Sequence, residues 1–407
     1  MHKINFKKSI CILICILSLC QPCFLQQLKE ISGRTKTGND IKTGADQTEK
    51  YLPLILNKRV AIVSNQTGII CKINLVDTLL KRKVNIKKIF CPEHGFRGNA
   101  DAGEELKNYK DKKTGLPIVS LYGKNNKPTP ADLNDIDVIV FDLQDVGVRF
   151  YTYISTLHYV MEACAENKKQ LIVLDRPNPN GYYIDGPVLE EKFKSFVGLH
   201  PVPIVYGMTI GEYAQMINGE GWLQRNIKCD LTIIKLQGYG HKDLYELPVK
   251  PSPNLPNMTA VYLYPSLALF EGTGISVGRG TPTPFQVIGH PTLKEAPYTF
   301  TPKNTTGASN PMYNGQECHG YSLKEYGDMI IKNSGQLYLF WLEGTYKSIA
   351  DKETYFNNYF NSLAGNATLK QQIIDNVSEE EIRKTWESGI KKFKVIRKKY
   401  LIYEDFE

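Results

Sequence analysis

Short, continuous runs of apolar residues, separated by helical patterns, constrain the fold of this chain more than any other feature. The strongest run covers residues 136–143 and is almost wholly apolar and β-branched, and similar runs cover residues 84–90 and 170–174. Because apolar residues fill consecutive positions instead of alternating, both faces of these strands are expected to be buried, as in a parallel sheet. Amphipathic segments at residues 75–82 and 151–166 predict intervening helices. The alternation predicts a doubly wound α/β domain.

Polar clusters follow four of the predicted strands. They are Ser64-Asn65, Glu93-His94, Asp142 to Asp145, and Asp175-Arg176. In an open parallel sheet the carboxyl ends of the strands lie on one edge, so these clusters are expected to meet at one crevice. Each cluster alone could instead cap the following helix. Four together favour a functional site.

Two glycine-rich loops carry ionisable groups. The first, residues 90–104, follows the strand at 84–90 and holds Glu93, His94 and Arg97 among glycines that exclude a regular helix or strand. The second, residues 271–282, holds Glu271 and Arg279. A loop leaving the carboxyl end of a strand is a common place for enzyme chemistry. The alternative for either loop is a solvated turn.

The length of 407 residues suggests about two domains. Between residues 240 and 257 the chain becomes a proline-rich connector that contains Ser252 and Asn254. We place the domain boundary there, with a first domain at residues 46–247 and a smaller second domain at residues 248–407 that completes the cleft.

The first residues predict export. Three lysines precede an apolar run at residues 10–17, which is the pattern of a secretory signal and is too short to span a bilayer. We therefore predict a signal peptide at residues 1–20 and a polar tether at residues 21–45. Residues 17–20 resemble a loose lipobox in which Cys20 would be lipidated, although Leu19 is larger than the usual residue. The expected location is the periplasm or cell envelope.

Several function classes lack support. Removing the signal lowers the net charge from +8 to about +5, without long basic blocks, so we expect no nucleic-acid partner. The nucleotide-binding patterns GxGxxG and GxxxxGK[ST] and the hydrolase pattern GxSxG do not occur in the first domain. Five widely spaced cysteines remain after the signal, without a CxxC pair, and no second histidine is spaced to join His94 around a metal. We therefore predict neither cofactor nor metal, which weakens a metal-dependent deacetylase as an alternative.

Motifs along nearly the whole chain resemble one bacterial family. The most specific is Pro92-Glu93-His94-Gly95-Phe96-Arg97-Gly98. The others, in family order, are Ser64-Asn65-Gln66-Thr67, Asp142-Leu143-Gln144-Asp145-Val146-Gly147, Arg149-Phe150-Tyr151-Thr152-Tyr153, Asp175-Arg176-Pro177-Asn178-Pro179, Pro253-Asn254-Leu255-Pro256, Glu271-Gly272-Thr273 and Gly278-Arg279-Gly280-Thr281. With these residues the chain resembles the NamZ-type glycoside hydrolases, which are exo-β-N-acetylmuramidases first catalogued as a domain of unknown function. Gly274 and Val277 depart from the expected pattern.

The resemblance implies a Rossmann-like, mostly parallel sheet domain and a smaller α+β C-terminal domain on either side of a cleft. It also implies release of N-acetylmuramic acid from the non-reducing end of peptidoglycan fragments, with muramyl saccharides as the ligands. The alternative on the same fold is a non-catalytic peptidoglycan-binding lipoprotein.

Glycoside hydrolysis normally uses two carboxyl groups, one as acid and one that stabilises or traps the positive anomeric centre. We assign Glu93 as the acid. Asp145 and Glu271 are equal candidates for the second role and Asp142 ranks lower, while the N-acetyl group of the substrate is a further candidate nucleophile.

Muramic acid carries a lactyl carboxylate that a guanidinium could bind, and aromatic rings such as Tyr151 and Tyr153 could stack on the sugar. The expected substrate-binding residues are Ser64, Asn65, His94, Arg97, Asp142, Arg149, Tyr151, Asp175, Arg176, Asn254 and Arg279.

Overall fold

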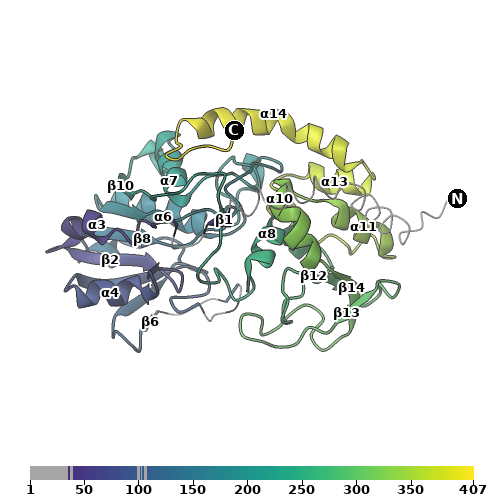
Figure 1. Ribbon diagram of the computed structural model, residues 1–407, viewed down its shortest axis with the longest axis horizontal. Helices are drawn as coiled ribbons and strands as arrows, with labels where there is room; N and C mark the ends of the chain where they lie inside the picture. The colour runs from purple at the N-terminus through teal and green to yellow at the C-terminus, as the bar shows by residue number, and fades with distance from the viewer. Residues whose placement is uncertain (1–34, 37–39, 99–100, 102, 105–107) are drawn as a thin grey trace.

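The computed structural model describes residues 35–36, 40–98, 101, 103–104 and 108–407. Two parts lie side by side (Figure 1). The first is built around a seven-stranded sheet, and the second around a three-stranded sheet and a group of short helices. One cluster of buried apolar side chains extends from Ala61 in the first part to Phe393 near the end of the chain. The two parts therefore share a hydrophobic core.

The large sheet confirms the predicted α/β architecture. Its strand order is β10-β9-β8-β2-β5-β7-β6, and every neighbouring pair is parallel except β6 with β7. The strands are β2 (Arg59–Ser64), β5 (Asn85–Cys91), β6 (Tyr109–Lys110), β7 (Pro117–Ser120), β8 (Val138–Asp142), β9 (Gln170–Leu174) and β10 (Asp230–Ile234). The chain leaves β2 in both directions, through β5 and β7 on one side and through β8, β9 and β10 on the other. This is the doubly wound arrangement.

Helices cover both faces of this sheet, which explains the continuous apolar runs. Alternate residues of β2 enter different clusters: Val60 and Ile62 pack with one, and Ala61 and Val63 with the other. The first face is covered by α3 (Thr48–Ile55) and α4 (Leu75–Lys81), and the second by α5 (Pro130–Leu133), α6 (Tyr153–Glu166) and α7 (Ile210–Gly219). Two small pairings complete this part, β3 (Ile69–Ile70) with β4 (Ile73–Asn74) and β1 (Thr35–Lys36) with β11 (Leu244–Tyr245).

The second part is α+β and smaller. Its antiparallel sheet has the order β12-β14-β13, formed by Val287–His290, Cys318–Ser322 and Tyr298–Phe300. Its helices are α8 (Met258–Leu267), η3 (Ala268–Gly272), α9 (Lys324–Tyr326), η4 (Gly327–Ile331), α10 (Lys332–Ser334), α11 (Phe340–Ser348), α12 (Phe360–Ala364), α13 (Thr368–Ile374) and α14 (Glu379–Lys398). This organisation matches the fold class implied by the family resemblance.

The packed chain begins before residue 46, so the predicted tether of residues 21–45 is too long. Ile41 and Ala45 are fully buried, and Lys42 bridges to Gln237. Gly44 donates its N–H to the carbonyl of Asp175, and a Cβ there would lie 2.5 Å from the Asp175 nitrogen. The glycine permits a close backbone approach, whereas the sequence pattern suggested a flexible linker. The predicted signal at residues 1–20, including Cys20, lies outside the described residues, and within them no helix is long and apolar enough to cross a membrane.

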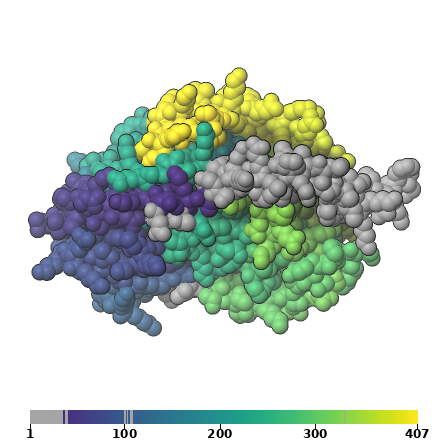
Figure 2. All heavy atoms as spheres, viewed as in Figure 1, coloured from purple at the N-terminus to yellow at the C-terminus, as the bar shows by residue number. Residues whose placement is uncertain are grey.

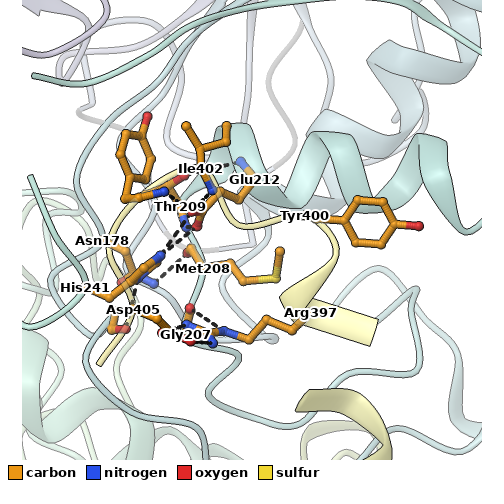
Figure 3. Close-up of polar contacts among 12 residues, drawn as sticks. Asn178, Gly207, Met208, Thr209, Glu212, His241, Arg397, Tyr400, Ile402 and Asp405 are labelled. Carbon is orange, nitrogen blue, oxygen red and sulfur yellow. Dashed lines mark hydrogen bonds and ion pairs between the residues drawn. The ribbon is translucent and has the colours of Figure 1, made fainter. Parts of the chain in front are cut away.

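The end of the chain returns to the first part. Helix α14 runs across both parts, and in the space-filling view it lies directly against residues of the first (Figures 1 and 2). The C-terminal tail, residues 399–407, is held there by buried polar groups (Figure 3). Glu212 accepts a 2.8 Å hydrogen bond from the N–H of Ile402, and Arg397 pairs with Asp405 through both terminal nitrogens. The last helix thus ties the second part to the first.

Candidate active site

Glu93 lies in the loop after β5, where backbone geometry rather than regular structure sets its position. The following residues His94 and Gly95 both have positive φ, at 69° and 74°, so the chain turns sharply just after Glu93. The half-buried carboxylate accepts two hydrogen bonds: Oε1 from the N–H of Gly103 at 2.9 Å and Oε2 from the hydroxyl of Thr152 at 3.0 Å. One carboxyl group is therefore fixed by the end of its own loop and by the start of α6.

Tyr122 is a third neighbour of Glu93. It follows β7, the next strand along the sheet edge. Burial raises the pKa of the Tyr122 hydroxyl, and the adjacent Glu93 carboxylate, which accepts a hydrogen bond from it, raises the pKa further. Phe196 packs edge-on against the Tyr122 ring at 5.7 Å between centroids. Tyr122 therefore contacts Glu93 through its hydroxyl and Phe196 through its ring.

Glu271 and Arg279 form an ion pair in the second part. Glu271 belongs to η3, and its Oε1 lies 2.8 Å from Nε and 2.7 Å from Nη2 of Arg279. About a quarter of each side chain is exposed, 25% for Glu271 and 23% for Arg279. The guanidinium also lies over the ring of Phe285, 5.0 Å from its centroid. This pair remains partly open to solvent, as a ligand-binding group must.

Two tyrosines lie near both Glu93 and the Glu271–Arg279 pair. Burial raises the pKa of Tyr359, and the negative charges of Glu271 and Glu93 raise it further. The same causes act on Tyr264, which is buried. Tyr359 is 43% exposed, so part of this residue is open to solvent. The two predicted catalytic glutamates, from different parts of the chain, therefore share the same two tyrosine neighbours.

Asp145, the other candidate for the second carboxyl group, is closed off. Only 3% of its surface is exposed. Its Oδ2 accepts hydrogen bonds from the N–H of Gly147, at 2.7 Å, and from the hydroxyl of Tyr206. Burial raises the pKa of Asp145 to about 6. Of the two equal candidates from the sequence, Glu271 is the one that a sugar can reach.

The polar clusters at the sheet edge do meet, but most of their members bond to one another. Asp142 and Arg176 form a buried two-bond ion pair of 2.6 and 2.9 Å. Asp175 accepts from the hydroxyls of Thr209 and Tyr403 and from a backbone N–H, and burial raises its pKa to about 6. These contacts stabilise the edge of the sheet and attach the C-terminal tail to it.

The three other arginines are also engaged in structural contacts. Arg97 pairs with Asp111 through two hydrogen bonds of 3.1 and 2.8 Å. Arg149 is fully buried and donates to four backbone carbonyls, those of Pro187, Val202, Leu363 and Ala364. Burial lowers the pKa of Arg149 to about 9. The bonds to Leu363 and Ala364 join the first part, which contains Arg149, to the second.

Five residues expected to bind substrate have no exposed surface, which corrects their predicted role. They are Ser64, Asn65, Asp142, Arg149 and Asp175. Asn65 illustrates the reason, because its amide donates to the hydroxyl of Tyr153 and its carbonyl oxygen accepts from Thr67. Such polar side chains at strand ends use their hydrogen-bonding groups to connect neighbouring segments at the sheet edge.

The remaining predicted residues are engaged with the proline-rich connector. Tyr151 is 7% exposed and donates to the carbonyl of Pro251, so it packs and does not present a face for a sugar. His94 lies 3.2 Å from the Ser252 hydroxyl, and Asn254 donates to the carbonyl of Gly307. The contacts of Tyr151 and His94 attach the connector to the first part, and the contact of Asn254 attaches it to the second.

Sequence reasoning missed Tyr122, Thr152, Tyr264 and Tyr359. The position of Tyr122 beyond the carboxyl end of a strand is a signal that could have found it, and Thr152 lies inside a motif already singled out. Tyr264 and Tyr359 follow no motif. Within the described ranges no group of three or more histidine, cysteine or acidic side chains is placed to hold a metal ion.

Comparisons with known proteins identify the family. The N-terminal domain of exo-β-N-acetylmuramidase NamZ matches residues 60–259, and its C-terminal domain matches residues 262–403. The peptidoglycan β-N-acetylmuramidase NamZ of Bacillus subtilis (strain 168) is 39% identical over 392 residues, which cover 89% of this chain and 91% of that protein. Two crystal structures of DUF1343 family proteins from Bacteroides fragilis NCTC 9343 are also similar. One is 45% identical with a TM-score of 0.83, the other 31% identical with a TM-score of 0.72, and both matches cover 90% of this chain and 99% of theirs. The matches span both parts of the molecule, as the motifs predicted, and the chain belongs to the exo-β-N-acetylmuramidase NamZ family.

Proposed function

We propose that this protein is an exo-acting glycoside hydrolase that releases N-acetylmuramic acid from the non-reducing end of peptidoglycan fragments. The observation that carries this proposal is that Glu93 and Glu271, one glutamate from each part of a NamZ-family chain, both lie near Tyr264 and Tyr359. Two carboxyl groups on either side of a cleft are what hydrolysis of a glycosidic bond requires.

In this proposal Glu93 protonates the leaving oxygen. It stands in a loop that α6 and Tyr122 hold in place, and it remains partly exposed. Glu271 carries the second role, because a quarter of its side chain is exposed and the guanidinium of Arg279 fixes its position. A carboxylate can stabilise positive charge at the anomeric carbon or trap it.

The proposed ligands are peptidoglycan-derived muramyl saccharides. Their lactyl carboxylate distinguishes them from N-acetylglucosaminides, and Arg279 is the residue proposed to bind this carboxylate. Glu271 occupies Nε and Nη2 of this arginine, while its Nη1 has no hydrogen-bond partner among the described residues. The exposed ring of Tyr359 supplies a face on which a sugar could stack.

The pattern of residues 1–20 supports export to the periplasm or cell envelope, with Cys20 as the proposed lipid anchor. Cell fractionation of the wild type and of Cys20→Ala checks this: the variant should leave the membrane fraction. Equal membrane association of the two proteins would contradict the anchor.

Glu93→Gln tests the proposed activity. The amide keeps the size of the side chain but carries no acidic proton, so kcat for release of N-acetylmuramic acid from a muramyl disaccharide should fall at least about a hundredfold. The wild type should release the sugar from the non-reducing end, which separates an enzyme from a peptidoglycan-binding protein. Wild-type turnover by a folded Gln variant would remove Glu93 from the mechanism.

A further inference from the structure

Thr152 occupies a helix-capping position but does not cap its helix. Three helices of the first part, α5, α6 and α7, have threonine at the N-cap. Thr129 and Thr209 both accept a hydrogen bond from the N–H three residues ahead and form a complete capping box. Thr152 makes no side-chain hydrogen bond to its helix. Since a capping hydroxyl stabilises its helix, Thr152 lacks a stabilising contact that Thr129 and Thr209 make.

Backbone geometry is the direct reason. The capping threonines have extended ψ angles of 160° and 165°, whereas Thr152 has a ψ of −1°. Capping normally requires the extended conformation, which turns the hydroxyl back over the first turn. The Thr152 hydroxyl instead donates to Oε2 of Glu93 at 3.0 Å, between side chains 59 positions apart in the sequence. Thr152 itself is 6% exposed, so this hydrogen bond is sheltered from competing water.

The two oxygens of Glu93 have partners of different kinds. Oε1 accepts from the backbone N–H of Gly103, which can only donate. Oε2 accepts from a hydroxyl, which can either donate or, after rotation, accept. The Tyr122 hydroxyl is a third donor to this carboxylate. Donors on both oxygens therefore hold the carboxyl group in one orientation.

We propose that Thr152 is a positioning residue for Glu93, which fixes the orientation of the carboxyl group through its hydrogen bond to Oε2. This inference rests on the proposed function, in which Glu93 is the general acid. The β-branched side chain of threonine suits the role, because few χ1 rotamers are open to it and the hydroxyl is held in place. Thr152 acts through Glu93 and forms no bond with the reacting atoms in this proposal.

The test uses leaving groups of different quality. The leaving group of a disaccharide is a sugar hydroxyl, which needs protonation to leave. The leaving group of a 4-nitrophenyl glycoside is 4-nitrophenolate, which leaves readily as an anion. Loss of acid catalysis should therefore slow hydrolysis of the disaccharide more than that of the 4-nitrophenyl glycoside. Thr152→Val keeps the shape and removes the hydroxyl. For a muramyl-N-acetylglucosamine disaccharide, kcat should fall about tenfold or more with KM changing less than about twofold, since a hydrogen bond to a charged group is lost. For 4-nitrophenyl N-acetylmuramide, kcat should change less than about threefold.

Three further variants separate the proposal from a general disturbance. Thr152→Ser restores the hydroxyl and should return kcat on the disaccharide towards wild type, while Thr152→Ala should repeat the Val result if Val fails to fold. Thr129→Val removes a genuine cap at α5 and should lower the melting temperature without changing either kcat. Unchanged disaccharide turnover in Thr152→Val, or equal losses on both substrates, would overturn the role of Thr152. Full activity of Glu93→Gln would instead overturn the proposed function.

Discussion

Four arginines resemble one another in the sequence, and their surroundings separate them. Arg97 and Arg176 pair with Asp111 and Asp142, and Arg149 donates to backbone carbonyls. Arg279 shares its space with both catalytic candidates, and its Nη1 has no hydrogen-bond partner among the described residues. A residue type therefore indicates what chemistry is available, but the partner indicates whether that chemistry is free for a ligand.

Arg279→Ala should reduce the preference for a muramide over an N-acetylglucosaminide by more than about tenfold. Removing the guanidinium leaves the lactyl carboxylate desolvated and unpaired, at a cost of about 2–5 kcal/mol that the N-acetylglucosaminide does not bear. The measurement is kcat/KM for both chromogenic sugars, and the ratio cancels any general loss caused by freeing Glu271. Arg97→Ala is the control, since Arg97 pairs with Asp111, and the ratio of this variant should not change. An unchanged ratio in Arg279→Ala would assign the lactyl group to backbone donors or pocket shape.

The sequence located the site better than it assigned the roles of its residues. The polar clusters were expected to meet because the carboxyl ends of parallel strands lie on one edge of a sheet, and the structure brings them together there. Whether a given carboxylate is exposed depends on partners far along the chain: Asp175 is covered by Tyr403, 228 residues later, and Arg149 by carbonyls more than 200 residues away. No local pattern contains that information.

At the scale of elements, strands with buried faces were predictable and elements with mixed surroundings were not. The predicted runs at 84–90 and 170–174 coincide with β5 and β9 to within a residue, because full burial leaves an apolar sequence. Strands β12 and β14 contain glycine and histidine, VIGH and CHGYS, and belong to a small sheet that is only partly covered. The short helices around them lack a periodic pattern long enough to detect. Helix α14 has its Ser378 cap and its amphipathic face within one segment, so its signal is contained in the local sequence.

The C-terminal tail offers a prediction at this scale. The Tyr403 hydroxyl donates to Asp175 at 2.5 Å and accepts from the N–H of Leu236 at 2.9 Å, so Tyr403→Phe leaves two buried groups short of a partner. We expect the free energy of unfolding to fall by about 1.5–3 kcal/mol. Tyr400→Phe is the matched control, because its hydroxyl contacts Glu220 near the surface, and it should cost less than about 1 kcal/mol. Urea denaturation measures both, and equal losses would mean that the buried contact with Asp175 contributes little.

At the scale of the whole molecule, the two parts behave as one structure. They share the large core cluster, and Arg149 of the first part holds the carbonyls of Leu363 and Ala364 in the second. Ser309 of the second part donates its N–H to Asp101 in the loop of Glu93. Glu93 and Glu271 are therefore held by one connected structure, so the distance between the two carboxyl groups is fixed by the packing of the two parts.

A buried histidine pair gives the whole molecule a pH dependence. His158 and His200 share a 3.0 Å hydrogen bond. Burial lowers the pKa of His158 to about 4, the charges of Lys127 and Lys194 lower it too, and Glu162 opposes them. The unfolded chain has the ordinary histidine pKa near 6.5, so between pH 6.5 and 4 it binds a proton that the folded protein does not. The contribution of His158 to stability is therefore complete above pH 6.5 and falls as the pH drops through this window.

His158→Gln should remove this contribution. Relative to the variant, the wild type should lose at most about 3 kcal/mol of unfolding free energy between pH 6.5 and 4. Asp145 and Asp175 act in the opposite direction, because burial raises their pKa to about 6 and their contributions fall as the pH rises from about 4 to 6. The free energy of unfolding is measured by urea denaturation at several pH values. The difference in this free energy between variant and wild type isolates the contribution of His158. A difference that does not vary with pH would show that His158 does not titrate in this range.

The attachment of the tail also sets an order of events during protein synthesis. Asp175 meets its partner Tyr403 only after 228 more residues have been made, and Glu212 meets Ile402 after 190. At about 5–20 residues per second, a ribosome needs roughly 10–45 seconds for the longer interval. Until then the carboxylates at this end of the sheet lack the partners that cover them, so the first part cannot reach its final state while the chain is still growing. A nascent chain that completes its fold late stays unfolded for longer, and passage through a translocation channel, as the proposed export requires, needs an unfolded chain.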